Sequence, residues 1–159
     1  MREEILDTIA LVQASIARDA TLLEAAGVLV RERVSAAAVL DPDGRVVGIF
    51  NEGRLIHGLF PGYLSELHHT AFAVDDPQIL DRCARQAATE LVEDHMAEAV
   101  LIDDDTSATH VAELFLHHEL AALPVVDGQS FVGMLRRADF AQAMLRRHRD
   151  EPEEPAATS

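Results

Sequence analysis

The chain has 159 residues, with 13 lysine and arginine residues against 28 aspartate and glutamate residues, and a formal charge of −15 at pH 7. This charge argues against a nucleic-acid-binding or anionic-membrane surface, because phosphate binding needs a basic patch. Apolar residues make up 48% of the chain, which is typical of a globular protein. No apolar run approaches the roughly 20 residues that span a bilayer, and the N-terminus lacks a signal-peptide pattern. We therefore expect a cytoplasmic protein without a membrane partner.

Two segments of the chain repeat one pattern of residues. The interval from Thr21 to Thr106 is 85 residues, and the interval from Asp41 to Asp127 is 86 residues. The extra residue falls in a turn, where changes of length are tolerated. An internal repeat indicates two copies of one structural unit.

Each copy begins with a helix signal. In the first copy, Asp19 and Thr21 precede apolar residues at helical spacing, and they predict a helix N-cap. In the second copy, Asp104 and Thr106 give the same signal. A helix of about three turns is expected after each signal.

Two short β-rich runs follow each helix, separated by a DPDG or DG turn signal. The four predicted strands cover residues 37–40, 46–50, 123–126 and 131–135. A closing helix is expected from Leu55 in the first copy and from Asp139 in the second. One unit of about 50 residues buries too little apolar surface to be stable alone, so we predict two copies packed sheet against sheet in an α+β fold.

A helical insert is expected between the copies. Pro61 and Gly62 break the chain, and the pair Asp76 and Pro77 is typical of a helix start. A helix from about Pro77 to Leu91 would place five residues close to one face: Ile79, Leu80, Cys83, Ala87 and Leu91. The predicted division is a first repeat over 1–60, a linker over 61–91, a second repeat over 92–149 and a disordered acidic tail over 150–159.

The residues of both copies follow one family pattern. The first copy contains ARDATLLEA and RERVSAAAVLDPDGRVVGIF, and the second contains VEDHMAEAVLIDDDTSATHVAELF and HELAALPVVDGQSFVGMLRRADF. On these motifs the chain resembles the tandem CBS-domain pair, or Bateman module. The resemblance covers both repeats and excludes the linker and the tail. It implies two pseudo-symmetric clefts between the repeats, often occupied by AMP, ADP, ATP or an adenosyl compound.

The resemblance assigns one cleft that is intact apart from one residue. Asp139 stands at the position of the carboxylate that binds ribose, and Arg136 stands where the family usually has threonine or serine. That arginine could bind phosphate through its fork of donors or fill the site itself. The remaining residues of the expected nucleotide site are Val34, Ser35, Ala36 and, against the base, Met134. Asp139 alone could equally be an ordinary helix cap.

The opposite cleft departs from the family pattern. Asn51 and Arg54 stand where the hydroxyl and the carboxylate are usual, and the facing residues are Leu120, Ala121 and Ala122. A ribose there would lose charge-assisted hydrogen bonds of roughly 1.5–3 kcal/mol. We therefore expect at most one nucleotide per chain.

The sequence contains no motif for catalysis, so we expect a regulatory sensor that is not an enzyme and has no cofactor. The resemblance implies a homodimer through the closing helices, with Leu55, Ile56 and Leu59 in one and Phe140, Ala143 and Met144 in the other. A protein effector of unknown identity would read the angle between repeats or subunits. The alternative is a structural protein-interaction module that binds no small molecule.

Eight histidines raise the question of a metal site. His110, Glu113 and His117 share a helical face, and His68 and His69 could add a ligand from the linker. The same residues also suit the polar face of an ordinary helix, and no HExxH or paired-cysteine motif occurs, so no metal is expected. The single cysteine, Cys83, can form no internal disulfide.

Overall fold

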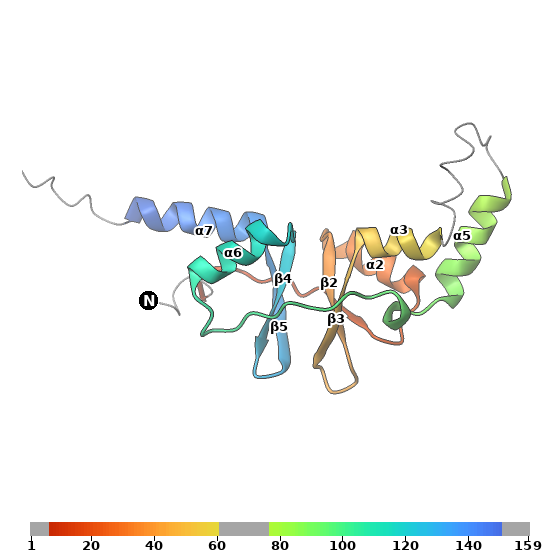
Figure 1. Ribbon diagram of the computed structural model, residues 1–159, viewed down its shortest axis with the longest axis horizontal. Coiled ribbons are helices and arrows are strands. Elements are labelled where there is room, and N and C mark those ends of the chain that lie inside the picture. The colour runs from red at the N-terminus through yellow and green to blue at the C-terminus, as the bar shows by residue number, and fades with distance from the viewer. Residues whose placement is uncertain (1–6, 61–76, 151–159) are drawn as a thin grey trace, which may run out of the picture.

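The computed structural model describes residues 7–60 and 77–150. Two small sheets lie side by side, with α2 and α3 flanking one and α6 and α7 flanking the other (Figure 1). The first sheet has the order β1-β2-β3, with β1 parallel to β2, and the second is the antiparallel pair β4-β5. The elements are β1 (Ser15–Ala17), α2 (Leu22–Glu32), β2 (Ala36–Leu40), β3 (Val46–Asn51), α3 (Glu52–Leu59), α5 (Pro77–Thr89), the 3₁₀ turn η1 (Val92–Asp94), α6 (Ala108–His117), β4 (Ala122–Asp127), β5 (Ser130–Arg136) and α7 (Arg137–Asp150).

The predicted repeat is confirmed, because α2-β2-β3-α3 and α6-β4-β5-α7 follow the same order. The closing helices begin earlier than predicted, at Glu52 rather than Leu55 and at Arg137 rather than Asp139. In each repeat the last strand runs directly into the closing helix without a loop. The first N–H of that helix donates to the residue before the preceding strand: Glu52 to the Ser35 oxygen at 3.0 Å before β2, and Arg137 to the Ala121 oxygen at 2.9 Å before β4.

The predicted helix cap is confirmed in the first repeat. Thr21 Oγ1 accepts from the Glu24 backbone N–H at 3.3 Å, and the Glu24 carboxylate accepts from the Thr21 N–H at 3.3 Å. This reciprocal capping box satisfies two donors that the helix itself leaves unpaired.

The predicted cap of the second repeat is wrong. The N-cap of α6 is Ser107, whose Oγ accepts from the His110 N–H at 3.2 Å. Thr106 instead closes the preceding turn, where its hydroxyl accepts from the Asp103 N–H at 3.0 Å and donates to the Asp103 carboxylate at 3.1 Å. A hydroxyl one residue closer to the helix takes the capping position.

Each repeat sends its lead-in segment across to the other repeat. The backbones of Val12 and Met134 exchange hydrogen bonds of 3.0 and 2.8 Å, which join the start of the first repeat to β5. The backbones of Ala97 and Ile49 exchange bonds of 2.8 and 2.9 Å, which join the start of the second repeat to β3. The two crossings are related by the same pseudo-symmetry as the repeats.

Glycine makes both crossings possible. A Cβ added to Gly133 would lie 2.5 Å from Leu11 Cβ, and a Cβ added to Gly48 would lie 2.5 Å from Met96 Sδ and 2.9 Å from the backbone oxygen of Ala97. These distances are far below van der Waals contact, so a side chain at either glycine would force the crossing backbone away.

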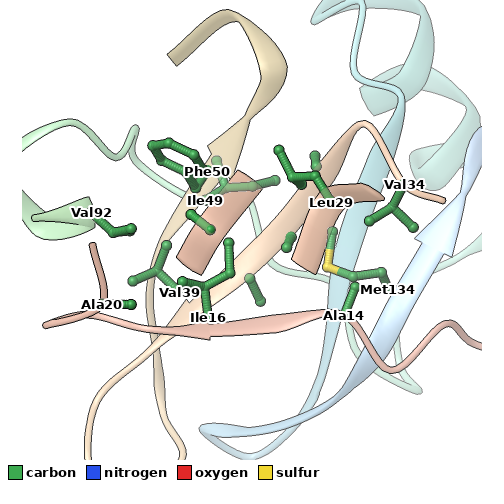
Figure 2. Close-up of a cluster of buried hydrophobic side chains, with 14 of the residues drawn as sticks. Ala14, Ile16, Ala20, Leu29, Val34, Val39, Ile49, Phe50, Val92 and Met134 are labelled. Carbon is green, nitrogen blue, oxygen red and sulfur yellow. The ribbon is translucent and has the colours of Figure 1, made fainter. Parts of the chain in front are cut away.

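The larger hydrophobic core contains residues of both repeats. Met134 of β5 has no exposed surface and belongs to the same cluster as Ala14, Leu29 and Val34 of the first repeat, as Figure 2 shows. A second cluster lies within the second repeat, where the rings of Phe115 and Phe140 are 5.7 Å apart. The core therefore ties the two sheets together rather than filling each unit separately.

The linker helix α5 packs on α2 and α3 and ends at Thr89, two residues before the predicted end. It ends there because the chain becomes extended and pairs with the start of α2, where the Leu22 N–H donates to the Glu90 oxygen at 3.0 Å. The Arg18 guanidinium donates to the Glu93 carboxylate at 2.8 Å just beyond this point, and that contact raises the pKa of Arg18.

Two details of the predicted helix face differ in the structure. The helical spacing predicts Leu80 on the apolar face of α5, but its side chain is 76% exposed. Cys83 is half-buried as expected, and its thiol lies 3.7 Å from the Leu59 oxygen. The predicted cap Asp76, the start of the linker and the predicted acidic tail beyond residue 150 lie outside the described residues.

Substitution of Gly133 by alanine should lower the free energy of unfolding by about 1–3 kcal/mol, because its Cβ would overlap Leu11 at the crossing. Urea unfolding followed by circular dichroism measures the change. Gly27→Ala is the matched control, because no atom lies within 4 Å of its added Cβ and its position in α2 is exposed. Gly27→Ala should stabilise the chain by about 0.5–1 kcal/mol. Equal effects of the two substitutions would contradict the close approach.

Removal of the α6 cap by Ser107→Ala should cost about 1 kcal/mol in the free energy of unfolding, because the His110 N–H loses its acceptor. The same denaturation experiment applies, with the exposed Thr109 of α6 replaced by alanine as the control. Thr109→Ala should be neutral or slightly stabilising, since alanine is the better helix former.

Candidate functional site

The candidate site lies where the two repeats meet. Strand β2 packs against both strands of the second sheet. The closing helices α3 and α7 both start at this central region and run outward in opposite directions (Figure 1). Two helix N-termini, each with a partial positive charge, therefore flank the junction of the repeats.

The predicted ribose carboxylate is present and already has a partner. Asp139 is the third residue of α7, and its side chain is 24% exposed. Arg136 Nε donates to Asp139 Oδ2 at 2.6 Å, and Arg136 Nη2 donates to Asp139 Oδ1 at 3.1 Å. This bidentate geometry is the strong form of a guanidinium–carboxylate contact. Two of the N–H donors of Arg136 are therefore bonded to the carboxylate that the resemblance assigns to ribose.

The segment expected to complete the cleft is mostly apolar. Val34 and Ala36 are each 6% exposed, and Ser35 between them is half-buried. The Ser35 backbone oxygen accepts from the Glu52 N–H at 3.0 Å, which fixes the segment to the start of α3. Its side chains thus offer one hydroxyl and no charge to a ligand.

Both segments that are expected to line the clefts follow a residue in the left-handed backbone region. Arg33, the C-cap of α2, has a φ of 54°, and Glu119, before the second segment, has a φ of 50°. Non-glycine residues adopt this conformation at a cost of about 1–2 kcal/mol. The same left-handed reversal of the chain therefore precedes each of the two segments, residues 34–36 and residues 120–122.

Met134, the expected contact to a base, lies in the shared core and has no exposed surface. Figure 2 shows its side chain among Ala14, Leu29 and Val34. In this conformation Met134 joins the two repeats, and contact with a base would require it to move.

The second predicted cleft has no carboxylate at the position equivalent to Asp139, although α3 begins at Glu52. Asn51 is the N-cap of α3, and its Oδ1 accepts from the Arg54 N–H at 2.8 Å. Arg54 is exposed. On the facing segment, Leu120 is half-buried, Ala121 is exposed and Ala122 is buried. The Asn51 side chain, at the position where the family usually has a hydroxyl, therefore caps the start of α3.

The structure also contains a groove that the sequence reading missed. An open groove of about 730 Å³ lies between α2 and α3. Its lining is largely apolar and consists of Ala26, Leu29, Val30, Arg33, Val34, Ser35, Glu52, Leu55 and Ile56. Each helix pattern alone shows only an amphipathic helix, and the groove depends on how the two helices pack.

Among the described residues, the histidines of α6 do not gather with other possible metal ligands. His110 Nδ1 lies 3.5 Å from the Glu113 carboxylate, and both side chains are largely exposed. In residues 7–60 and 77–150, no three His, Cys, Asp or Glu side chains are placed to hold a metal ion. His68 and His69 lie outside those ranges. The same described ranges contain no helix that is both long enough and apolar enough to cross a bilayer.

Comparison with known proteins gives a family and a fold. A model of the CBS domain matches residues 3–60 and 92–146. No curated protein sequence gives a significant match. A CBS domain-containing protein of unknown function from Kribbella flavida has a similar structure, with a TM-score of 0.71, 18% identity, and coverage of 90% of this chain and 97% of that one.

The CBS-pair protein CBSX2 from Arabidopsis thaliana is also similar, with a TM-score of 0.69, 20% identity, and coverage of 92% of this chain and 97% of that one. A structure of CBSX2 in complex with AMP has a TM-score of 0.65 and 21% identity, and it covers 91% of this chain and 97% of that one. Because the family model matches both repeats, and the crossed repeats have the fold of CBS pairs, this chain belongs to the CBS domain family as a tandem CBS pair.

Proposed function

We propose that this CBS pair is a non-catalytic regulatory module that binds one adenine nucleotide in the cleft of Asp139. The observation that carries the proposal is the half-buried Asp139 carboxylate, on the first turn of a helix that starts at the junction of the repeats. A carboxylate can accept hydrogen bonds from both hydroxyls of a ribose. The complex of CBSX2 with AMP supports this ligand class.

The other residues of the cleft have roles that suit such a ligand. The side chains of Ser35 and Ala36 are small and uncharged, which suits contact with a base, and the Ser35 hydroxyl can donate or accept. The N-terminus of α7 favours a phosphate group. The opposite cleft has Arg54 at the position equivalent to Asp139, so one nucleotide per chain is expected.

The shared core supports a mechanism for regulation. A nucleotide between the repeats contacts both of them, so it favours the angle between them that fits it best. Met134 and the crossing at Gly133 connect β5 directly to the first repeat. A change of angle would therefore alter the outer surface of the pair, where a partner protein can read it.

Thermal melting with millimolar AMP, ADP, ATP and S-adenosylmethionine tests the proposal. A nucleotide that binds only the folded chain stabilises it by about 2.7 kcal/mol at a hundredfold excess over Kd, which raises Tm by several degrees. Asp139→Asn should weaken binding by about tenfold to a hundredfold, because hydrogen bonds to a charged group are lost. Asp104→Asn removes the same charge from an exposed loop and should leave the shift unchanged.

Absence of a Tm shift with all four compounds, together with absence of heat in calorimetry, would overturn nucleotide binding. A shift that survives Asp139→Asn would place the ligand elsewhere.

One observation favours a second function, a protein-interaction module without a small-molecule ligand. Both oxygens of Asp139 are already bonded to Arg136, so the cleft has its own internal partner. Without a ligand, this ion pair would simply fix the start of α7 beside β5. The melting experiment separates the two functions, since the second predicts no shift.

We further propose that the pair forms a homodimer through its closing helices. Ile56 of α3 is 49% exposed and lines the groove beside α2, while Met144 of α7 is 39% exposed. Leu55 and Leu59 pack against the first core, Phe140 is buried in the second, and Ala143 is half-buried against it. Exposed apolar side chains on both closing helices suit a symmetric interface.

Substitution of Ile56 by glutamate should convert the dimer to a monomer, because the charge would enter an apolar interface. Light scattering after gel filtration should give about twice 17.4 kDa for the parent chain and 17.4 kDa for the variant. Leu80→Glu on α5 is the control, since Leu80 is 76% exposed and is not part of a closing helix. A parent chain that is monomeric at all concentrations would overturn the dimer.

A further inference from the structure

We propose that Arg136 makes the Asp139 cleft selective for ligands with a 5′-phosphate. The cleft would bind a nucleotide better than the neutral nucleoside, and better than an adenosyl compound with a positive sulfonium in place of the phosphate. The inference rests on the proposed function, since it concerns the same cleft, and it specifies which members of the ligand class that cleft accepts.

The ion pair with Asp139 uses only part of the Arg136 guanidinium. Arg136 uses Nε and one N–H of Nη2 to bind the two Asp139 oxygens. A guanidinium has five N–H donors in a planar fork, so three donors remain for another acceptor. Within residues 7–60 and 77–150 those three donors have no hydrogen-bond partner, and the Arg136 side chain is 43% exposed.

The backbone holds both Arg136 and Asp139 in place. Arg136 is the last residue of β5 and is paired with Ala122 of β4. The next N–H, of Arg137, donates to the Ala121 oxygen at 2.9 Å. Asp139 follows on the first turn of α7. A ligand therefore meets a guanidinium and a carboxylate whose backbone positions are fixed, and the side chains alone can adjust.

A bound ribose would compete with Arg136 for the Asp139 carboxylate. Its hydroxyls would donate to the same Asp139 oxygens that now accept from Arg136, and each new donor weakens or replaces part of the guanidinium contact. A 5′-phosphate compensates, because it supplies a new anion to Arg136. A neutral nucleoside offers no such anion, and a sulfonium adds a second positive charge beside the guanidinium.

The charge of the rest of the chain makes the Arg136 cation important for an anionic ligand. The chain has a formal charge of −15, so its overall field opposes an anionic ligand. The facing residues Val34, Ser35 and Ala36 carry no charge. Arg136 is the one cationic side chain among the residues of the expected site, the N-terminus of α7 adds a partial positive charge, and Arg33 and Arg137 are neighbours in sequence outside that set. Selectivity for phosphate should depend on this one side chain.

Isothermal titration calorimetry of the full chain with ATP, AMP, adenosine and S-adenosylmethionine tests the inference. We expect ATP and AMP to bind at least about tenfold more tightly than adenosine or S-adenosylmethionine, the factor typical of a lost hydrogen bond to a charged group. In Arg136→Gln the nucleotides should weaken while adenosine is unchanged or tighter, so that the preference falls to less than about threefold. Arg85→Gln removes the same charge from exposed α5 and should retain the parent preference.

Two different failures can be told apart. If all four compounds bind the parent chain with similar Kd values, or if Arg136→Gln keeps the preference for nucleotides, the selectivity is overturned while nucleotide binding stands. If none of the four compounds binds, nucleotide binding and the selectivity are both overturned. Circular dichroism of each variant checks that it is folded.

Discussion

The two repeats share one core only because each lead-in segment passes directly against a strand of the other repeat. The crossing at Gly133 brings Leu11 so close that even a methyl group would overlap it, and the crossing at Gly48 is equally tight against Met96. Backbone hydrogen bonds of 2.8 to 3.0 Å then pair the crossing segments with β5 and β3. The side chains behind them can pack as one cluster, because neither glycine adds a side chain at its crossing.

The position of the candidate site follows from these crossings. Once β5 is held against the first repeat, the start of α7 lies at the junction of the two sheets, and the start of α3 is there by the same pseudo-symmetry. Helix N-termini and the ends of strands leave polar groups that a ligand can use. The expected clefts would thus be a consequence of how the repeats are joined, because each one needs residues of both repeats.

The two expected clefts differ in their side chains, although the backbone around them is arranged equivalently in the two repeats. Equivalent positions hold Arg136 and Asp139 in one and Asn51 and Arg54 in the other. The first pair forms a bidentate ion pair between side chains, and in the second a side chain caps the helix backbone. Equivalent backbone positions therefore hold an aspartate in one repeat, Asp139, and an arginine in the other, Arg54.

The sequence by itself determined the repeat, the order of the elements, both hairpin turns and the family, because these depend on local signals such as the Thr21 cap and the glycines of the turns. It also identified Asp139 and its unusual neighbour Arg136. The tertiary structure decided that Arg136 binds Asp139, that Met134 lies in the shared core rather than open in the cleft, and that α2 and α3 form a groove. Those outcomes depend on contacts between segments far apart in the chain, and local patterns of residues do not encode the distances between such segments.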